Sequence, residues 1–387
     1  MNIFYNEKTK KLTIKQKEKK IMQEKTANGV LIIPALNPEK SFVGLAKQMT
    51  KYFTDIIVVD DGSTQETKGI FQELKAALGK RLHLLTHEIN LGKGEAIKTA
   101  VRYYKSSSLC ERYCGVLTAD CDGQHLPEDC MKVDKALGKN HEKALHIGYR
   151  DLSSGLMPLR SKFGNKSTVW LFSMLYGIKL KDTQSGLRAF SGDILDWLIS
   201  VKGSRVEYEM NVLIESKNAG VCIYETPITT RYEINHKSHF RTGRDSLKVL
   251  KVLFAGLYKF MLAALAAAGV DLGGFALIYY VLCPESMDVA TALLLSTVIS
   301  RLLSSLVNFL FNRYVTFGGK AVARSSILKY YALWLVQMGS SYAAVLGLTT
   351  LFGGAEMLIK LVVDLVLATI GYQIQLRWVF KKKQVRE

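Results

Sequence analysis

The chain has 387 residues, enough for two or three domains of average size, each with its own core. Its formal net charge is +18, from 52 Lys and Arg against 34 Asp and Glu, and 48% of its residues are hydrophobic, which excludes both a disordered tail and an acidic binding protein. Charged residues are much scarcer in residues 253–380 than elsewhere, so the last third has the composition of a membrane segment.

Residues 1–27 are rich in lysine and contain no apolar core, which predicts a flexible basic arm rather than a signal peptide. The six cysteines include no Cys-x-x-Cys pair, which favours a reducing, cytoplasmic setting. A zinc site from Cys110, Cys114, Cys121 and His125 is not expected. The spacing of these residues is irregular, and on a strand Cys121 would face away from its flanking aspartates.

Short β-branched runs alternate with amphipathic helical stretches over residues 28–235. Five strands are predicted, at residues 30–36, 55–60, 82–86, 115–119 and 143–149. This alternation predicts βαβ units and a parallel, Rossmann-like α/β sheet. Ligands bind such sheets at the carboxyl ends of the strands, so the chemistry is expected there.

Polar or glycine residues follow each of the first four predicted strands. The four segments are residues 34–37 (Pro-Ala-Leu-Asn), 60–63 (Asp-Asp-Gly-Ser), 90–94 (Asn-Leu-Gly-Lys-Gly) and 120–125 (Asp-Cys-Asp-Gly-Gln-His). One Asp-Asp-Gly turn alone is a weak signal, because such turns also cap helices. Four such strand ends in succession predict a substrate site.

Asp120 and Asp122 follow an apolar strand and are two residues apart, so both carboxylates can reach one hard divalent cation. Gln124 adds a further oxygen ligand nearby. We expect Mg²⁺ or Mn²⁺, which would bridge a diphosphate and neutralise the charge that grows on a departing nucleotide. An isolated Asp-x-Asp is usually a solvated turn, but this context favours the metal site.

Lys93 lies in a Gly-Lys-Gly segment before a predicted helix, where backbone and ammonium can contact a diphosphate. The alternative is a helix start with a surface lysine. A dehydrogenase is not expected, because Ile97 occupies the third glycine position of the dinucleotide fingerprint.

Together with residues 182–190 (Asp-Thr-Gln-Ser-Gly-Leu-Arg-Ala-Phe), these motifs resemble family 2 glycosyltransferases of GT-A fold. Within that family they resemble the polyprenol-phosphate hexosyltransferases of the dolichyl-phosphate mannose synthase type, over about residues 28–250. The resemblance implies a metal-dependent hexosyltransferase whose cation is held by Asp120, Asp122 and Gln124, with Asp122 catalytic. It also implies a nucleotide pocket lined by Pro34, Asn37 and Asp61, and Lys93 and Asp120 complete the predicted nucleotide-sugar site.

A polyprenyl phosphate acceptor is already ionised at neutral pH, so it needs positive charge rather than a general base. Arginine suits this role because its forked donors match a phosphate. The candidates are Arg150 and Arg160, with ordinary surface arginines as the alternative. The resemblance places both near the lipid phosphate as catalytic residues. It also gives Asp182 and Arg188 catalytic roles on the acceptor side, where a turn and a structural ion pair are the alternatives.

Residues 236–258 form a basic amphipathic stretch that anionic lipid should attract. By the same resemblance, Ser238 and Arg241 in this stretch contact the acceptor lipid. Four apolar stretches of membrane-spanning length follow within residues 259–380, at 259–282, 289–312, 327–352 and 357–380. The loop between the second and third spans and the tail at residues 381–387 are basic, which predicts that the catalytic domain and both termini are cytoplasmic.

The four spans resemble GtrA-like membrane domains, a family associated with polyprenol-linked sugars. The second span ends in residues 312–317 (Asn-Arg-Tyr-Val-Thr-Phe) and the fourth in 376–380 (Leu-Arg-Trp-Val-Phe), which indicates either a duplicated hairpin or two similar interface anchors. A lone charge in lipid is unfavourable, so Asp271 and Arg301 are predicted to pair, while Lys360 extends outward.

The sequence therefore predicts a multi-pass enzyme of the cytoplasmic membrane. It would transfer glucose or mannose, with inversion, from a UDP- or GDP-hexose to an undecaprenyl or dolichyl phosphate. A nucleic-acid partner is not expected, because the positive charge lies in the arm, the juxtamembrane stretch and the loops. The alternatives are a lipid-linked sugar translocator with a donor-binding domain and a processive polysaccharide synthase, although Ile374 stands where the Gln-x-x-Arg-Trp motif of such synthases needs Gln. A homo-oligomer is left open.

Overall fold

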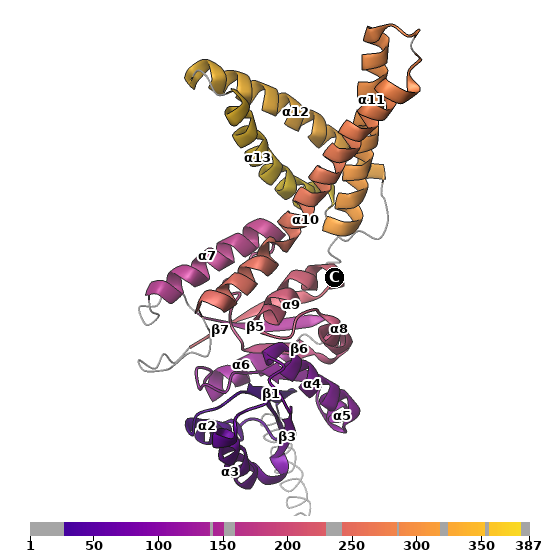
Figure 1. Cartoon of the computed structure of the whole chain (residues 1–387). Coiled ribbons are helices and arrows are strands. Elements are labelled where there is room, and N and C mark those ends of the chain that lie inside the picture. The colour runs from indigo at the N-terminus through magenta and orange to yellow at the C-terminus, as the bar shows by residue number, and fades with distance from the viewer. Residues whose placement is uncertain are drawn as a thin grey trace, which may run out of the picture. The chain divides into compact units, whose positions relative to one another are not determined.

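The computed structural model describes residues 27–139, 142–150, 159–229, 242–284, 286–317, 324–352 and 356–380. The chain divides into two compact units, whose elements are labelled in Figure 1. The first comprises the chain up to Val169 together with Leu180–Val249. The second comprises Trp170–Lys179 and the chain from Leu250 onward.

The first unit is built on a seven-stranded sheet in the order β3-β2-β1-β4-β6-β5-β7. The strands are β1 (Gly29–Ala35), β2 (Ile56–Asp60), β3 (Leu82–Thr86), β4 (Gly115–Thr118), β5 (Ala144–Arg150), β6 (Arg188–Ser191) and β7 (Cys222–Ile228). β1 pairs in parallel with β2 and β4 and is buried throughout, as expected for an apolar run covered on both faces. The five predicted strands are confirmed to within one residue at each end.

The sheet is mixed, and the prediction of a parallel sheet was wrong in this respect. β6 runs antiparallel between β4 and β5. Its four residues are too few to show a clear periodicity, so the sequence pattern indicated neither the strand nor its direction. β7 pairs in parallel with β5 at the sheet edge and is only partly buried, so it lacks a long apolar run.

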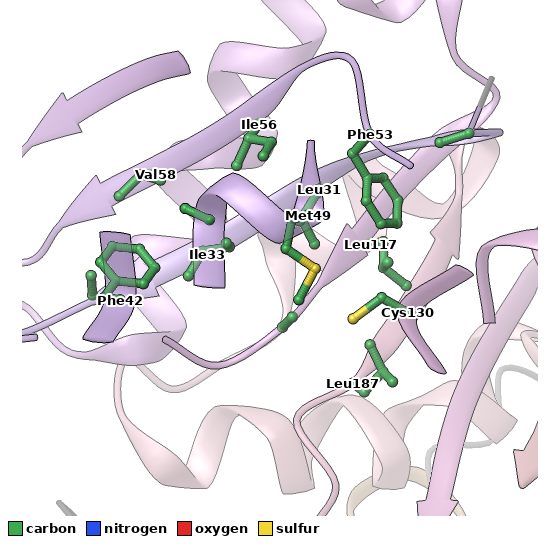
Figure 2. Close-up of a cluster of buried hydrophobic side chains, with 14 of the residues drawn as sticks. Leu31, Ile33, Phe42, Met49, Phe53, Ile56, Val58, Leu117, Cys130 and Leu187 are labelled. Carbon is green, nitrogen blue, oxygen red and sulfur yellow. The ribbon is translucent and has the colours of Figure 1, made fainter. Parts of the chain in front are cut away.

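Helices cover both faces of this sheet. α2 (Ser41–Met49), α3 (Lys68–Leu78) and α6 (Pro127–Leu137) contribute to one cluster of buried side chains, which brings Leu31 and Ile33 of β1 together with Phe42 and Met49 of α2 (Figure 2). α4 (Lys93–Ser106) packs on β1 and β2 through residues outside this cluster and so covers the other face. The remaining helices of this unit are α5 (Leu109–Arg112), α8 (Leu195–Ser200) and α9 (Val206–Ala219).

The second unit holds four helices long and apolar enough to cross a membrane, which confirms the predicted spans and describes a multi-pass membrane protein. They are α10 (Thr242–Leu277), whose residues up to Val249 belong to the first unit, α11 (Val289–Phe311), α12 (Arg324–Phe352) and α13 (Glu356–Ile374). Three of them continue into π-helical turns, at Ile278–Leu282, Asn312–Thr316 and Gln375–Val379. α10 begins inside the predicted juxtamembrane stretch, so this stretch and the first span form one helix rather than two elements.

Helix α7 (Leu159–Tyr176) corresponds to the apolar segment after Arg160, and its last turns belong to the second unit. Phe172 and Leu175 are buried there, whereas Trp170 is exposed. The Tyr176 hydroxyl donates to the carbonyl of Leu253 in α10 at 2.9 Å. The end of α7 is therefore anchored on the first membrane helix.

Two ion pairs lie within the spans. Arg301 Nε lies 3.3 Å from Asp271 Oδ2, as predicted. Lys360 Nζ lies 2.9 Å from Asp364 one turn along the same helix, so its charge is compensated within α13, which the prediction of an outward-extending lysine did not anticipate.

The ends of the second and fourth spans have the same backbone arrangement. Each closes in a π-helical turn in which a phenylalanine N–H returns to a carbonyl five residues earlier, Phe317 to Asn312 at 2.9 Å and Phe380 to Gln375 at 2.8 Å. The two phenylalanine rings stack on each other, with centroids 5.1 Å apart. Phe317 and Phe380 hold equivalent positions in the two hairpins. Contact between such equivalent residues is expected where a two-fold axis relates two repeats.

Six aromatic rings extend this relation. In order of contact they are Phe260, Tyr372, Phe317, Phe380, Phe309 and Tyr330. The outermost contacts are both edge-on, at 5.4 and 5.2 Å, and the next pair lies at 5.6 and 5.7 Å. Exchanging the two hairpins maps each contact onto its counterpart. This geometry favours a duplicated hairpin over two unrelated interface anchors.

Phe380→Ala should destabilise the membrane unit by about 3 kcal/mol, because it empties a buried ring site, and Phe317→Ala by about 2 kcal/mol, because Phe317 is only partly buried. The loss of stability in the double variant should be about 1 kcal/mol smaller than the sum of the two single losses, because the two rings stabilise each other. Unfolding in mixed micelles measures both quantities. Leu302→Ala on the exposed face of α11 is the control, with little effect expected, and strict additivity of the two phenylalanine variants would contradict the stacked pair.

Candidate active site

Residues 120–125 form a turn just beyond β4, next to the end of β1. Cys121 therefore lies in a turn and not on a strand, and its side chain packs against the core cluster. Burial raises the pKa of its thiol to about 12. A neutral thiol is a poor metal ligand, and the described residues contain no group of three or more His, Cys, Asp or Glu side chains arranged for a metal.

Asp120 belongs to a charged network. Its Oδ1 lies 2.6 Å from Lys93 Nζ, and its Oδ2 lies 3.3 Å from His125 Nε2. Burial opposes ionisation of this carboxyl, but the Lys93 ammonium outweighs that effect and holds the pKa of Asp120 well below its usual range. Asp120 is therefore an anionic group at neutral pH.

Lys93, the first residue of α4, extends between two carboxylates. Besides Asp120, its Nζ lies 3.1 Å from the carboxylate of Glu209 on α9. Burial lowers the pKa of an ammonium, but these two carboxylates outweigh it and raise the pKa of Lys93. Lys93 is thus part of the site and not a surface lysine. The preceding Gly92 has φ +102°, and a side chain there would overlap Ser204, so the loop needs glycine.

Asp61 is buried beneath the loop that carries Lys93. Its carboxylate accepts the backbone N–H groups of Leu91 at 2.9 Å and Gly92 at 2.8 Å, and it lies 2.8 Å from His87 Nδ1. Asp61 therefore fixes this loop relative to the end of β2. Its contact with a nucleotide stays a prediction.

Asn37 links the ends of β1 and β2. Its N–H donates to the Ser63 hydroxyl at 2.9 Å, and its side-chain oxygen accepts the Thr64 N–H at 2.8 Å. Asn37 has φ +46°, a conformation that asparagine tolerates better than most residues. Pro34 is buried within β1. The two strand ends lie together as predicted, while the contacts of Pro34 and Asn37 with a nucleotide stay predictions.

Arg150 and Asp182 form a two-point ion pair. Nε of Arg150, at the end of β5, lies 2.6 Å from Asp182 Oδ2, and Nη2 lies 3.1 Å from Oδ1. Asp182 is fully buried, yet its pairing with the guanidinium outweighs burial and lowers its pKa. This arrangement makes Asp182 a residue that orients Arg150.

Arg188, at the start of β6, is almost fully buried. Its guanidinium donates to the carbonyls of Ser185 at 2.9 Å, Thr183 at 3.2 Å and Glu209 at 2.7 Å. The sequence placed Arg188 on the acceptor side or in an ion pair. The structure instead commits its donors to backbone carbonyls, so Arg188 folds the 182–187 loop and ties it to α9.

Gly186 brings that loop against Asp120. A Cβ atom at Gly186 would overlap the Asp120 carboxylate. The Gly186 carbonyl accepts the Thr118 hydroxyl at the end of β4, at 3.0 Å. The 120–125 turn and the 182–187 loop, both identified in the sequence, therefore meet at Asp120.

For three of the predicted site residues, the structure does not describe the side chain. Arg160 lies in the first turn of α7, but its side chain is outside the described residues, and Ser238 and Arg241 lie outside them altogether. Gln124 donates its backbone N–H to Asp122 Oδ1 at 3.0 Å, which orders the turn that carries both aspartates.

The sequence analysis assigned no role in this site to two residues, His125 and Glu209. His125 ends the Asp-Cys-Asp-Gly-Gln-His segment and contacts Asp120, so its position in a recognised motif was the available signal. Glu209 belongs to no motif. The only hint was an acidic residue between Tyr208 and Met210, both of which are buried.

The donor set at this site is compatible with a hard divalent cation. Asp120 and Asp122 are carboxylates on one turn, and Asp120 is kept ionised by its surroundings. Mg²⁺ commonly binds through one or two carboxylates, completing its shell with substrate phosphates and water. The residues therefore fit a cation that arrives with a diphosphate better than a resident structural metal.

Comparison with known proteins identifies two domains in the chain. Residues 31–190 match the family model described as glycosyl transferase family 2, and residues 259–380 match the GtrA/DPMS transmembrane domain. A UDP-N-acetylglucosamine–dolichyl-phosphate N-acetylglucosaminyltransferase of Methanococcus voltae is 32% identical over 220 residues, covering 52% of this chain and 85% of that protein.

Two further relatives are similar. An uncharacterised protein of Methanocaldococcus jannaschii is 31% identical over 230 residues, and the match covers 58% of this chain and 88% of that protein. The polyprenol monophosphomannose synthase of Mycolicibacterium smegmatis is 26% identical over 212 residues, covering 53% and 77%. On both its domains and its relatives, the chain belongs to the polyprenol-phosphate glycosyltransferases, with a family 2 glycosyltransferase domain followed by a GtrA/DPMS transmembrane domain.

Proposed function

We propose that this transferase moves one hexose, glucose or mannose, from a UDP- or GDP-sugar to a polyprenyl phosphate, with inversion. The observation that carries the proposal is the meeting of Lys93, Asp120 and the 182–187 loop at the carboxyl edge of the sheet, in a chain with four membrane spans. A cation and paired carboxylates suit a nucleoside diphosphate. N-acetylglucosamine, the sugar named for the relative from Methanococcus voltae, is the competing donor sugar.

We propose that Asp120, Asp122 and Gln124 hold Mg²⁺ or Mn²⁺ when the donor is bound. The cation would neutralise charge on the departing diphosphate. Lys93 adds a second positive charge beside Asp120, and the 90–94 loop that carries it is fixed by Asp61. The nucleotide contacts of Pro34, Asn37 and Asp61 belong to the same proposal.

The acceptor side of the proposal rests on Arg150 and Arg160. A polyprenyl phosphate is its own nucleophile, so the protein must orient it and need not remove a proton. Asp182 holds the Arg150 guanidinium in one orientation at the end of β5, which leaves little freedom to be lost on binding. Ser238 and Arg241 are proposed to contact the lipid where α10 begins.

The catalytic domain and both termini are proposed to face the cytoplasm. The basic loop between the second and third spans and the basic tail support this orientation. In this proposal, the donor and the acceptor phosphate meet on the cytoplasmic side of the membrane.

The purified protein, with Mn²⁺ or Mg²⁺ and a short polyprenyl phosphate, should transfer label from one member of a panel of nucleotide sugars. The product should enter the organic phase and be labile to mild acid, because a sugar joined to a phosphate is an activated acetal. UDP-glucose, GDP-mannose and UDP-N-acetylglucosamine form the panel. Label that stays aqueous with every donor would contradict the proposed transfer and favour a translocator.

Asp122→Asn should reduce metal-dependent transfer by about 10²-fold or more, because it removes a charged ligand from the cation. The variant should keep its thermal stability, since Asp122 lies in a turn outside the core. Glu128→Gln, an exposed carboxylate nearby on α6, is the matched control and should retain activity. Wild-type activity in Asp122→Asn would remove the metal assignment.

Gly186→Ala should lower turnover by about 10²-fold, because the added methyl displaces the Asp120 carboxylate and misplacement of about 1 Å is enough for such a loss. Gly164→Ala on α7, where a Cβ meets nothing within 4 Å, is the control for the substitution itself. Steady-state kinetics and Mn²⁺ titration measure the effect. Equal activity of the two variants would show that Asp120 does not need its present position.

A further inference from the structure

The Lys93 ammonium is shared by two carboxylates from different parts of the fold. Asp120 belongs to the turn after β4, and Glu209 belongs to α9. Their carboxylates lie 2.6 and 3.1 Å from Lys93 Nζ, and less than a third of the surface of each of the three side chains is exposed, with Glu209 the least at 17%. The arrangement therefore holds one positive charge between two negative charges.

Glu209 is itself held in place. Its carbonyl accepts the Arg188 guanidinium at 2.7 Å, so this turn of α9 is tied to the 182–187 loop. Gly94, next to Lys93, approaches Tyr208 so closely that a Cβ would overlap its ring. α4 and α9 are therefore in direct contact at this point, and the distance between Lys93 and Glu209 is set by backbone packing.

A divalent cation on Asp120 would face the ammonium that already occupies Asp120 Oδ1. Two positive groups on one carboxylate repel each other, and a partly buried site screens them poorly. Lys93 must then give up its contact with Asp120. If the Lys93 ammonium moved into solvent, the partly buried Glu209 carboxylate would lose its counter-ion, which is unfavourable. If the ammonium stays on Glu209, both charges remain paired.

We propose that Glu209 is a positioning residue that retains Lys93 when a divalent cation takes Asp120. Lys93 is then a displaceable counter-ion, which pairs Asp120 before the cation arrives and remains beside it afterwards. The proposal rests on the metal role of Asp120 in the proposed function. Glu209 belongs to none of the sequence motifs. Its proposed role is to hold Lys93 while the divalent cation replaces Lys93 as the counter-ion of Asp120.

The test is a double-mutant cycle on Mn²⁺ affinity, read by electron paramagnetic resonance on the full chain in detergent without donor. Glu209→Gln should weaken Mn²⁺ binding about tenfold, because Lys93 then pairs with Asp120 alone. Lys93→Met should tighten it by removing the competitor. In the Lys93→Met background, Glu209→Gln should have no further effect. Glu209→Asp should recover part of the affinity lost in Glu209→Gln.

Glu95→Gln is the matched control, since Glu95 lies two residues after Lys93 in α4 and pairs instead with Arg102, at 2.8 Å. It should leave Mn²⁺ affinity unchanged. An equal effect of Glu209→Gln with and without Lys93 would overturn the proposal, because it would reveal a general electrostatic influence of Glu209. So would unchanged affinity in Glu209→Gln.

Absence of Mn²⁺ binding in both the wild type and Lys93→Met would overturn the proposal together with the metal assignment. Transfer of label to lipid in metal-free buffer would still establish the sugar transfer in that case. The two failures are therefore distinguishable.

Discussion

The site depends on keeping Asp120 ionised in a partly buried position. An isolated carboxylate there would be neutralised by protonation, and a neutral acid neither binds a cation well nor attracts a lysine. Lys93 supplies the compensating charge from the start of α4, and Glu209 balances Lys93 from α9. Three segments distant in the sequence are thus held at one edge of the sheet by a single requirement for charge balance.

Much of each motif supports the loops that bring these charges together. Asp61 receives the N–H groups of the 90–94 loop, and Arg188 gives its donors to the carbonyls of the 182–187 loop. Both side chains are buried and bind main-chain atoms. A charged residue in a motif is therefore not by itself a substrate contact, and the backbone it holds can be the functional part.

The sequence predicted what local pattern and strand order determine. The β-branched runs gave five strands, the polar residues after them gave the edge where the site lies, and the apolar lengths gave four spans. Two features escaped because they depend on tertiary contacts. The direction of β6 shows only in its pairing with β4 and β5, and the contact of Glu209 with Lys93 depends on α9 packing on α4. Neither leaves a periodic signal. The backbone contacts of Arg188 escaped for a related reason, since the sequence shows a charge but not which atoms its donors reach.

The membrane unit shows how a duplicated framework can carry different chemistry in its two halves. The offset that relates Phe309 to Tyr372 also relates Arg301 to Asp364, and the offset that relates Phe260 to Tyr330 also relates Asp271 to Ser341.

The polar contacts follow this correspondence. Arg301 meets Asp271 at 3.3 Å in one hairpin, and Asp364 meets Ser341 at 2.7 Å in the other. The position of the contact is the same while the charges differ. In the first hairpin the acid is neutralised across helices, and in the second Asp364 is neutralised by Lys360 on its own helix. The aromatic rings therefore keep the two-fold relation between the hairpins. The ionisable residues do not keep it, because each hairpin compensates its acidic residue with a different partner.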